Sequence, residues 1–119
     1  MSDKEWWEKP YTDTDWERFK KNQVEFETNI MKMVNEAEKN RESLWLQNQA
    51  AMILGLHSKR LTYLDENREI MHPAHIKEME YSTEVTRKLL RSIIEAAERI
   101  GIKGPFIPAI IREDLEKYK

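Results

Sequence analysis

The chain has 119 residues, 35% of them charged, and its 20 Lys and Arg residues nearly balance its 22 Asp and Glu residues. This length is that of one domain, and the balanced charge argues against a general binder of polyanions and against an acidic mimic of DNA. The absence of cysteine excludes disulfides, thiolate nucleophiles and cysteine-based zinc or iron–sulfur sites.

The composition predicts an all-α protein, because only three glycines and four prolines interrupt long runs of residues that favour helix. The N-terminus has no apolar segment of the signal-peptide type, and the longest apolar run, residues 50–56, is too short to span a membrane. We therefore expect a cytoplasmic protein that makes no contact with membranes.

The first twelve residues form a charged arm that contains two adjacent tryptophans, Trp6 and Trp7. A helix is expected to begin near residue 13, because Thr12 and Asp15 have the spacing of an N-terminal capping box. Thr14 and Glu17 offer an alternative box two residues along.

Apolar residues then recur at steps of three and four up to about residue 66, which predicts helix but leaves its path open. The polar cluster at residues 39–43 predicts a reversal into helices near 13–39 and 43–66, with Asn40 in a left-handed or capping conformation. The alternative is one unbroken helix, which would need a partner chain. A third helix near 74–100 has Pro73 in its first turn.

Gly101 is expected to end the third helix in the left-handed conformation, with Ile102 folded back on the last turn. The following prolines predict an extended segment at 103–108, and Pro108 can open a short final helix. The predicted architecture is an antiparallel bundle of three long helices and a short C-terminal one. We divide it into an arm (1–12), a bundle core (13–100) and a C-terminal turn and helix (101–119).

The segment 44–57 is apolar all around a helix, so we expect other helices to cover it on most sides. Gln47, Asn48 and Gln49 would then set the helix register or lie at a subunit boundary; the alternative is that they line a small-molecule pocket. Gly55 is unfavourable within a helix, so it indicates either close packing of another helix or a local kink, and Ala50 and Ala51 one turn before it favour close packing.

Two further clusters suggest ligands. His72 and His75 have carboxylates three residues before and after them, but Pro73 interrupts the helix there and a second Glu-x-x-His motif is missing. We therefore predict no metal and no cofactor, and we interpret His57 as a surface residue. The second cluster is basic and is the candidate site for an anionic ligand; its residues are Lys59, Arg60, Arg87, Lys88 and Arg91.

The basic cluster has a simpler interpretation as a solvated face paired with Glu84, Glu95 and Asp65. For catalysis, the sequence has no phosphate-binding glycine loop, no nucleophile elbow and no carboxylate pair with a distinctive spacing. We therefore predict no enzymatic activity.

Large apolar groups in the arm and the C-terminal segment are expected to dock on an apolar surface, either of the chain's own bundle or of a second copy. The function that follows is a self-associating binding or regulatory module, with itself and possibly another protein as partner; a binder of nucleotide or nucleic acid is the alternative. The predicted partner-binding residues are Trp6, Trp7, Tyr11, Trp45, Phe106, Ile107, Ile110 and Ile111.

Overall fold

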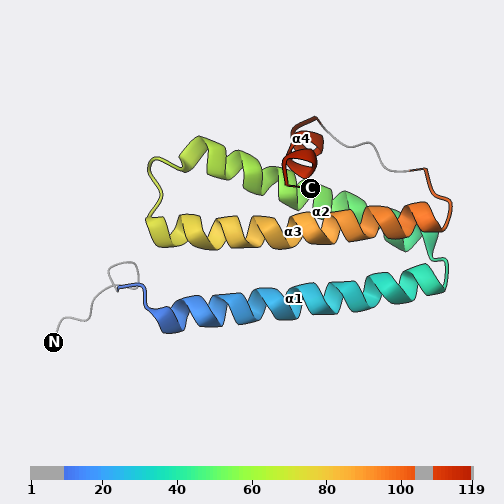
Figure 1. Cartoon of the computed structure of the whole chain (residues 1–119), viewed down its shortest axis with the longest axis horizontal. Coiled ribbons are helices and arrows are strands. Elements are labelled where there is room, and N and C mark those ends of the chain that lie inside the picture. The colour runs from blue at the N-terminus through green and yellow to red at the C-terminus, as the bar shows by residue number, and fades with distance from the viewer. Residues whose placement is uncertain (1–9, 104–108, 119) are drawn as a thin grey trace.

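The computed structural model describes residues 10–103 and 109–118, which contain helices and turns and no strand (Figure 1). Its helices are α1 (Asp13–Lys39), α2 (Ser43–Asn67), α3 (Pro73–Arg99) and α4 (Ala109–Lys117). The three-helix bundle with a short C-terminal helix is confirmed, and the unbroken helix through residues 13–66 is wrong. The chain reverses because three residues between Lys39 and Ser43 leave the helical path.

The helix starts follow local sequence signals. At α1 the Thr12 side chain accepts from the backbone N–H of Asp15, whose carboxylate accepts in return from Thr12, so the first of the two predicted capping boxes forms. At α3, Pro73 occupies the first turn and the ring of His72 accepts from the backbone N–H of Ala74 at 3.0 Å. His72 is therefore a capping residue.

The two turns differ in how they reverse the chain. After α1, Asn40 is the capping residue, and Arg41, not Asn40, takes the left-handed conformation with φ of 55°. After α3, Gly101 has φ of 86° and the N–H of Ile102 donates to the carbonyl of Ala97 at 3.0 Å, as predicted for a glycine-ended helix.

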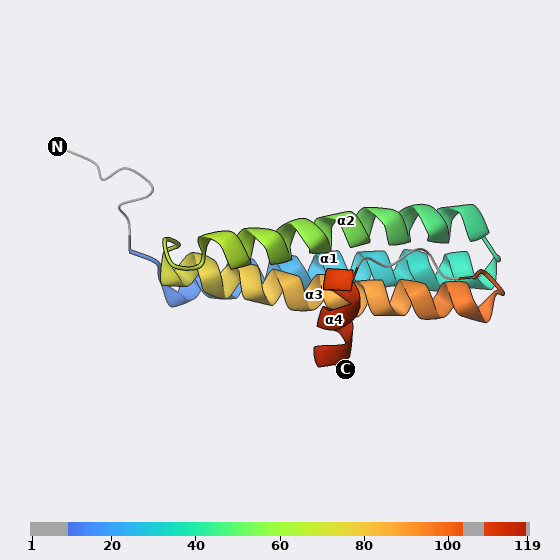
Figure 2. The same ribbon diagram turned by 90° about the horizontal axis from the view of Figure 1, so that it is seen from above.

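Helix α3 is the centre of the bundle. It packs along α2 and along α1, whereas α1 and α2 contact each other much less. Figures 1 and 2 show the three long helices side by side, with α4 crossing α2 and α3 steeply near their middle. The buried core is formed by Val34, Ala37, Leu46, Ala50, Ile53, Val85, Leu89, Leu90, Ile93, Ala96 and Ile111.

Both ends of the α1–α3 pair have side-chain contacts. At one end the ring of Tyr81 meets Trp16 edge-on, with ring centroids 5.5 Å apart. At the other end Arg99 donates two hydrogen bonds to Glu38 at 2.7 and 2.8 Å. Because α1 is fixed to α3 in this way, the side of α2 that faces away from α3 has no long helix over it.

Helix α2 is consequently less covered than its sequence suggested. Leu44 is 72% exposed and Met52 is 65% exposed, so the described helices of one chain do not cover this segment on most sides. No side chain of the described residues approaches the position of a Cβ at Gly55 within 4 Å. The close helix contact predicted at Gly55 is therefore not made within this part of the chain.

Candidate functional site

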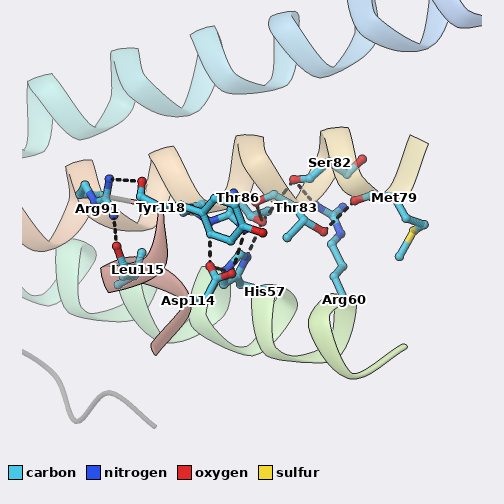
Figure 3. A network of polar contacts seen from close by, with 11 residues as sticks. His57, Arg60, Met79, Ser82, Thr83, Thr86, Arg91, Asp114, Leu115 and Tyr118 are labelled. Atoms are coloured by element: carbon cyan, nitrogen blue, oxygen red, sulfur yellow. Dashed lines mark hydrogen bonds and ion pairs between the residues drawn. The ribbon is translucent and has the colours of Figure 1, made fainter. Parts of the chain in front are cut away.

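The contact of α4 with α2 and α3 contains a buried ionic network centred on Asp114 (Figure 3). Arg87 of α3 donates from Nε and Nη2 to the two carboxylate oxygens of Asp114 at 2.7 and 2.9 Å. His57 of α2 places Nε2 2.8 Å from Asp114 Oδ2. The carboxylate of Asp114 therefore links α4 to both α2 and α3.

His57 has no exposed surface, so its interpretation as a surface residue is wrong. It lies on the side of α2 that α3 and α4 cover, and α4 comes from a segment 57 residues later in the chain. Its Nδ1 is 2.8 Å from Thr86 Oγ1, and that hydroxyl is also 2.9 Å from the carbonyl oxygen of Thr83. A neutral ring whose Nε2–H donates to Asp114 fits this geometry when the Thr86 hydroxyl turns its one proton from the carbonyl of Thr83 to Nδ1.

The surroundings of this network shift the pKa values of its members. Burial lowers the pKa of His57, and the nearby cations of Arg87 and Arg60 add to this effect, while the hydrogen bond to Asp114 opposes it. Burial by itself would raise the pKa of Asp114, but the hydrogen bonds from Arg87 and His57 hold that pKa below its usual range. The arrangement is therefore a carboxylate between a guanidinium and a neutral imidazole.

A hydroxyl, an imidazole and a carboxylate in sequence resemble a nucleophilic triad, but this one is not arranged for attack on a substrate. Thr86 and His57 are both 0% exposed, and the Thr86 side chain lies against the carbonyls of its own helix. A substrate cannot approach the hydroxyl while α4 is in place. The network therefore acts as a clamp on α4.

Further contacts fix the end of α4. Arg91 donates to the carbonyl oxygens of Leu115 at 2.5 Å and Tyr118 at 3.3 Å, which satisfies carbonyls that have no partner within the helix. The Arg87 guanidinium lies 3.9 Å from the centre of the Tyr118 ring, and Ile111 is fully buried in the core. Helix α4 is thus held by an apolar anchor, a charge pair and a cap.

The residues of the predicted basic cluster make different contacts. Arg87 and Arg91 bind α4, and Arg60 donates to the carbonyl of Ser82 at 3.2 Å. Lys88 lies 3.9 Å from Glu84, which matches one of the expected surface pairings. Lys59 is exposed on α2. The structure therefore does not gather the five cations around an open anion site.

A groove of about 520 Å³ runs along α2 and α3 beside α4. Leu61 and Leu64 contribute its apolar surface. Its lining contains charges of both signs; the charged residues are Arg68, Glu80, Glu84, Arg87, Lys88, Arg91 and Asp114. A groove that contains three carboxylates among its cations is a weak site for a phosphate.

The predicted partner-binding residues are in different places. Tyr11 is partly exposed, and its hydroxyl donates to Glu78 of α3 at 2.8 Å. Trp45 is partly buried and packs against the core, and Ile111 is buried inside it. These two residues therefore pack on the chain's own bundle. The other five residues, or their side chains, lie outside the described part of the structure; these are Trp6, Trp7, Phe106, Ile107 and Ile110.

Asp114 is a residue of this network that the sequence prediction missed together with His57 and Thr86, although a signal for Asp114 was present. It follows Ile111 by three residues and precedes Tyr118 by four, so it lies on the apolar side of the short helix. A carboxylate in that position needs a buried partner. The sequence does not say which of the many cations provides it.

Within residues 10–103 and 109–118 no group of three or more histidine, aspartate or glutamate side chains is arranged to hold a metal ion. None of the described helices combines the length and the apolar character needed to cross a membrane. Comparison of the chain with known protein families, curated proteins and solved structures finds no match. Proposals about function therefore depend on the geometry alone.

The network predicts that acid destabilises the protein. Because the pKa of His57 is lowered on folding, its contribution to stability is complete above the unfolded value of about 6.5 and is lost as the pH falls below it. The lowered pKa of Asp114 acts in the same direction at still lower pH. Urea midpoints at roughly pH 7.5 and pH 5 should show this loss.

Two substitutions isolate the contribution of the buried ring. His57→Gln should reduce the difference between the urea midpoints at the two pH values, whereas His75→Gln, at an exposed position on α3, should leave it unchanged. Equal differences in wild type and His57→Gln would contradict the assignment to His57.

Proposed function

We propose that this protein is a small helical protein–protein interaction module of the cytoplasm that self-associates through one side of α2. We define the α2 face as Leu44, Asn48, Ala51, Met52 and Gly55, which are all exposed. They recur at steps of three and four and so lie along one side of the helix. The exposure of Leu44 and Met52 in this uncharged segment is the observation that supports the proposal.

The α2 face is unusual in this chain because it has no charge. Residues 43–58 contain no Asp, Glu, Lys or Arg, although charged residues make up 35% of the chain. A solvated helix side would normally carry charged residues, so an uncharged side with exposed Leu and Met is typical of a contact surface. Ala51 and Gly55 leave room for the backbone of another helix.

A second copy of α2 is the partner that fits this surface. The most frequent oligomers are two-fold dimers, in which the same patch meets itself. Such a contact is penalised when like charges oppose each other, and the α2 face has no charges to oppose. The face also leaves α4 undisturbed, because Gly55 and His57 are about 200° apart around the helix.

The test is to place charge on the face. Leu44→Glu together with Met52→Glu should weaken self-association by roughly 100-fold or more, since it brings four carboxylates together in a dimer. Sedimentation equilibrium measures the association, and circular dichroism should show unchanged helix content because both positions are exposed.

Ile70→Glu is the matched control, because Ile70 is 83% exposed but lies in the turn after α2. It should leave association unchanged. A wild-type chain that remains monomeric at the highest soluble concentration would refute the proposal before any variant is made. Five residues remain predicted contact residues that this test does not require; they are Trp6, Trp7, Phe106, Ile107 and Ile110.

The alternative, an anion-binding module, has less support. Two of its five residues, Arg87 and Arg91, already bind groups of α4. A phosphate-bearing ligand would have to compete with Asp114 for Arg87. The proposed module needs no cofactor and carries out no reaction.

A further inference from the structure

We propose that the site beneath α4 is a receptor for a helical segment, and that α4 of one copy can occupy this site in a second copy. This contact is separate from the α2 face, since the two lie on opposite sides of α2. The receptor is formed by His57, Thr86, Arg87 and Arg91, which all belong to α2 and α3.

The receptor recognises its helix by side chains and by the helix end. Ile111 enters the core, and Asp114, three residues later, binds Arg87 and His57. Arg91 then binds the carbonyls of the last turn, at Leu115 and Tyr118. These contacts require a short helix that ends at the right place, and another copy of the chain supplies the same helix.

Separation of α4 from the receptor is unfavourable both for α4 and for the receptor. Helix α4 has nine residues, which is too few for a stable isolated helix in water. Without Asp114, the receptor keeps the cations of Arg87 and Arg60 close to His57 with no carboxylate to balance them. An open receptor therefore favours binding of any available α4, whichever copy provides it.

The length of the connection permits exchange between neighbouring copies. Ile102 packs against the core, and six residues separate it from the start of α4 at Ala109. Six residues span at most about 20 Å. Exchange therefore requires a second copy packed directly against the α4 side, with its receptor within about that distance of Ile102.

Complementary charge reversal tests exchange directly. A chain with Arg87→Asp and a chain with Asp114→Arg each oppose like charges at the site, so each alone should have a lowered Tm. When the two chains are mixed in equal amounts, both sites are matched only if α4 is exchanged. The expected result is a 1:1 heterodimer by native mass spectrometry, with recovery of most of the lost Tm.

The double variant R87D/D114R in one chain is the control for tolerance of the reversed pair. If it regains the wild-type Tm while the mixture behaves as the sum of its parts, exchange does not occur and the proposal is overturned. If it does not regain that Tm, exchange is tested by a second measurement in which Asp114 and Arg87 are unchanged.

That measurement is cross-linking between two single-cysteine chains, which is clean because the chain has no cysteine of its own. Lys88 and Tyr118 line the same groove, so K88C in one chain and Y118C in the other should be joined by a short bismaleimide when α4 is exchanged. I70C replaces K88C to measure background. Heterodimer yield above background supports exchange, and yield equal to background overturns it.

The two proposals fail separately. Adding L44E and M52E to both cysteine chains removes the α2 contact but leaves the receptor unchanged. Cross-linking that persists supports exchange even if the α2 face proves not to be an interface. Cross-linking that disappears with these changes shows that exchange does not occur independently of the α2 face, which overturns the proposal.

Discussion

Replacing Asp114 with alanine is expected to release α4 and to lower the free energy of unfolding by about 3 kcal/mol. The change removes the carboxylate that receives two hydrogen bonds from Arg87 and one from His57. Arg87 and Asp114 are about nine-tenths buried, so water cannot fully replace the lost partner. The loss should therefore be much larger than that from an exposed ion pair.

Urea unfolding followed by circular dichroism measures this loss, and hydrogen exchange locates it. Amides of α4 should lose protection first, while those in the middle of α1 should keep it. Glu113→Ala is the matched control, because Glu113 is the preceding residue on the same helix and is exposed. A chain in which both substitutions cost the same would show that the network does not hold α4.

Replacing Leu46 with alanine is expected to cost about 3 kcal/mol, whereas Leu44→Ala should cost less than about 0.5 kcal/mol. The two leucines are two residues apart on α2, but Leu46 is fully buried and Leu44 is 72% exposed. Removing the Leu46 side chain leaves a cavity in the core between the helices. Removing that of Leu44 leaves only a smaller surface group.

The same pair of variants separates folding from association. Urea midpoints measured at a concentration where the chain is monomeric should fall only for Leu46→Ala. Sedimentation at higher concentration should show weaker association for Leu44→Ala, because that side chain belongs to the α2 face. Similar losses of stability in both variants would mean that α2 is rotated from the orientation described here.

Much of the fold followed from local signals in the sequence. The capping box of Thr12 and Asp15, the proline at the start of α3 and Gly101 at its end each act over a few neighbouring residues. Their effect on the backbone is therefore readable without knowledge of distant contacts. The start of α1 and both ends of α3 were predictable for this reason, whereas α2 has no side-chain cap and its bounds followed from the polar residues that flank it.

The site was predictable only in fragments. The sequence showed that Arg87 and Arg91 are close together on one helix, and that an apolar side is present in the final helix. It did not show that Asp114 lies opposite Arg87, because the two are 27 residues apart and a carboxylate has many possible cations. A polar residue on an apolar helix side was the one available sign.

By itself, the sequence determined where α1 begins and where α3 begins and ends, because capping groups, prolines and glycines act on the backbone within one turn. The tertiary structure decided which side of α2 is buried, since the uncharged segment at residues 43–58 is apolar all around the helix and has no preferred side. It also decided that His57 is buried and that α4 binds across α2 and α3. Both outcomes depend on contacts between segments that are far apart in the chain. Such contacts are set by the packing of the whole chain and not by neighbouring residues.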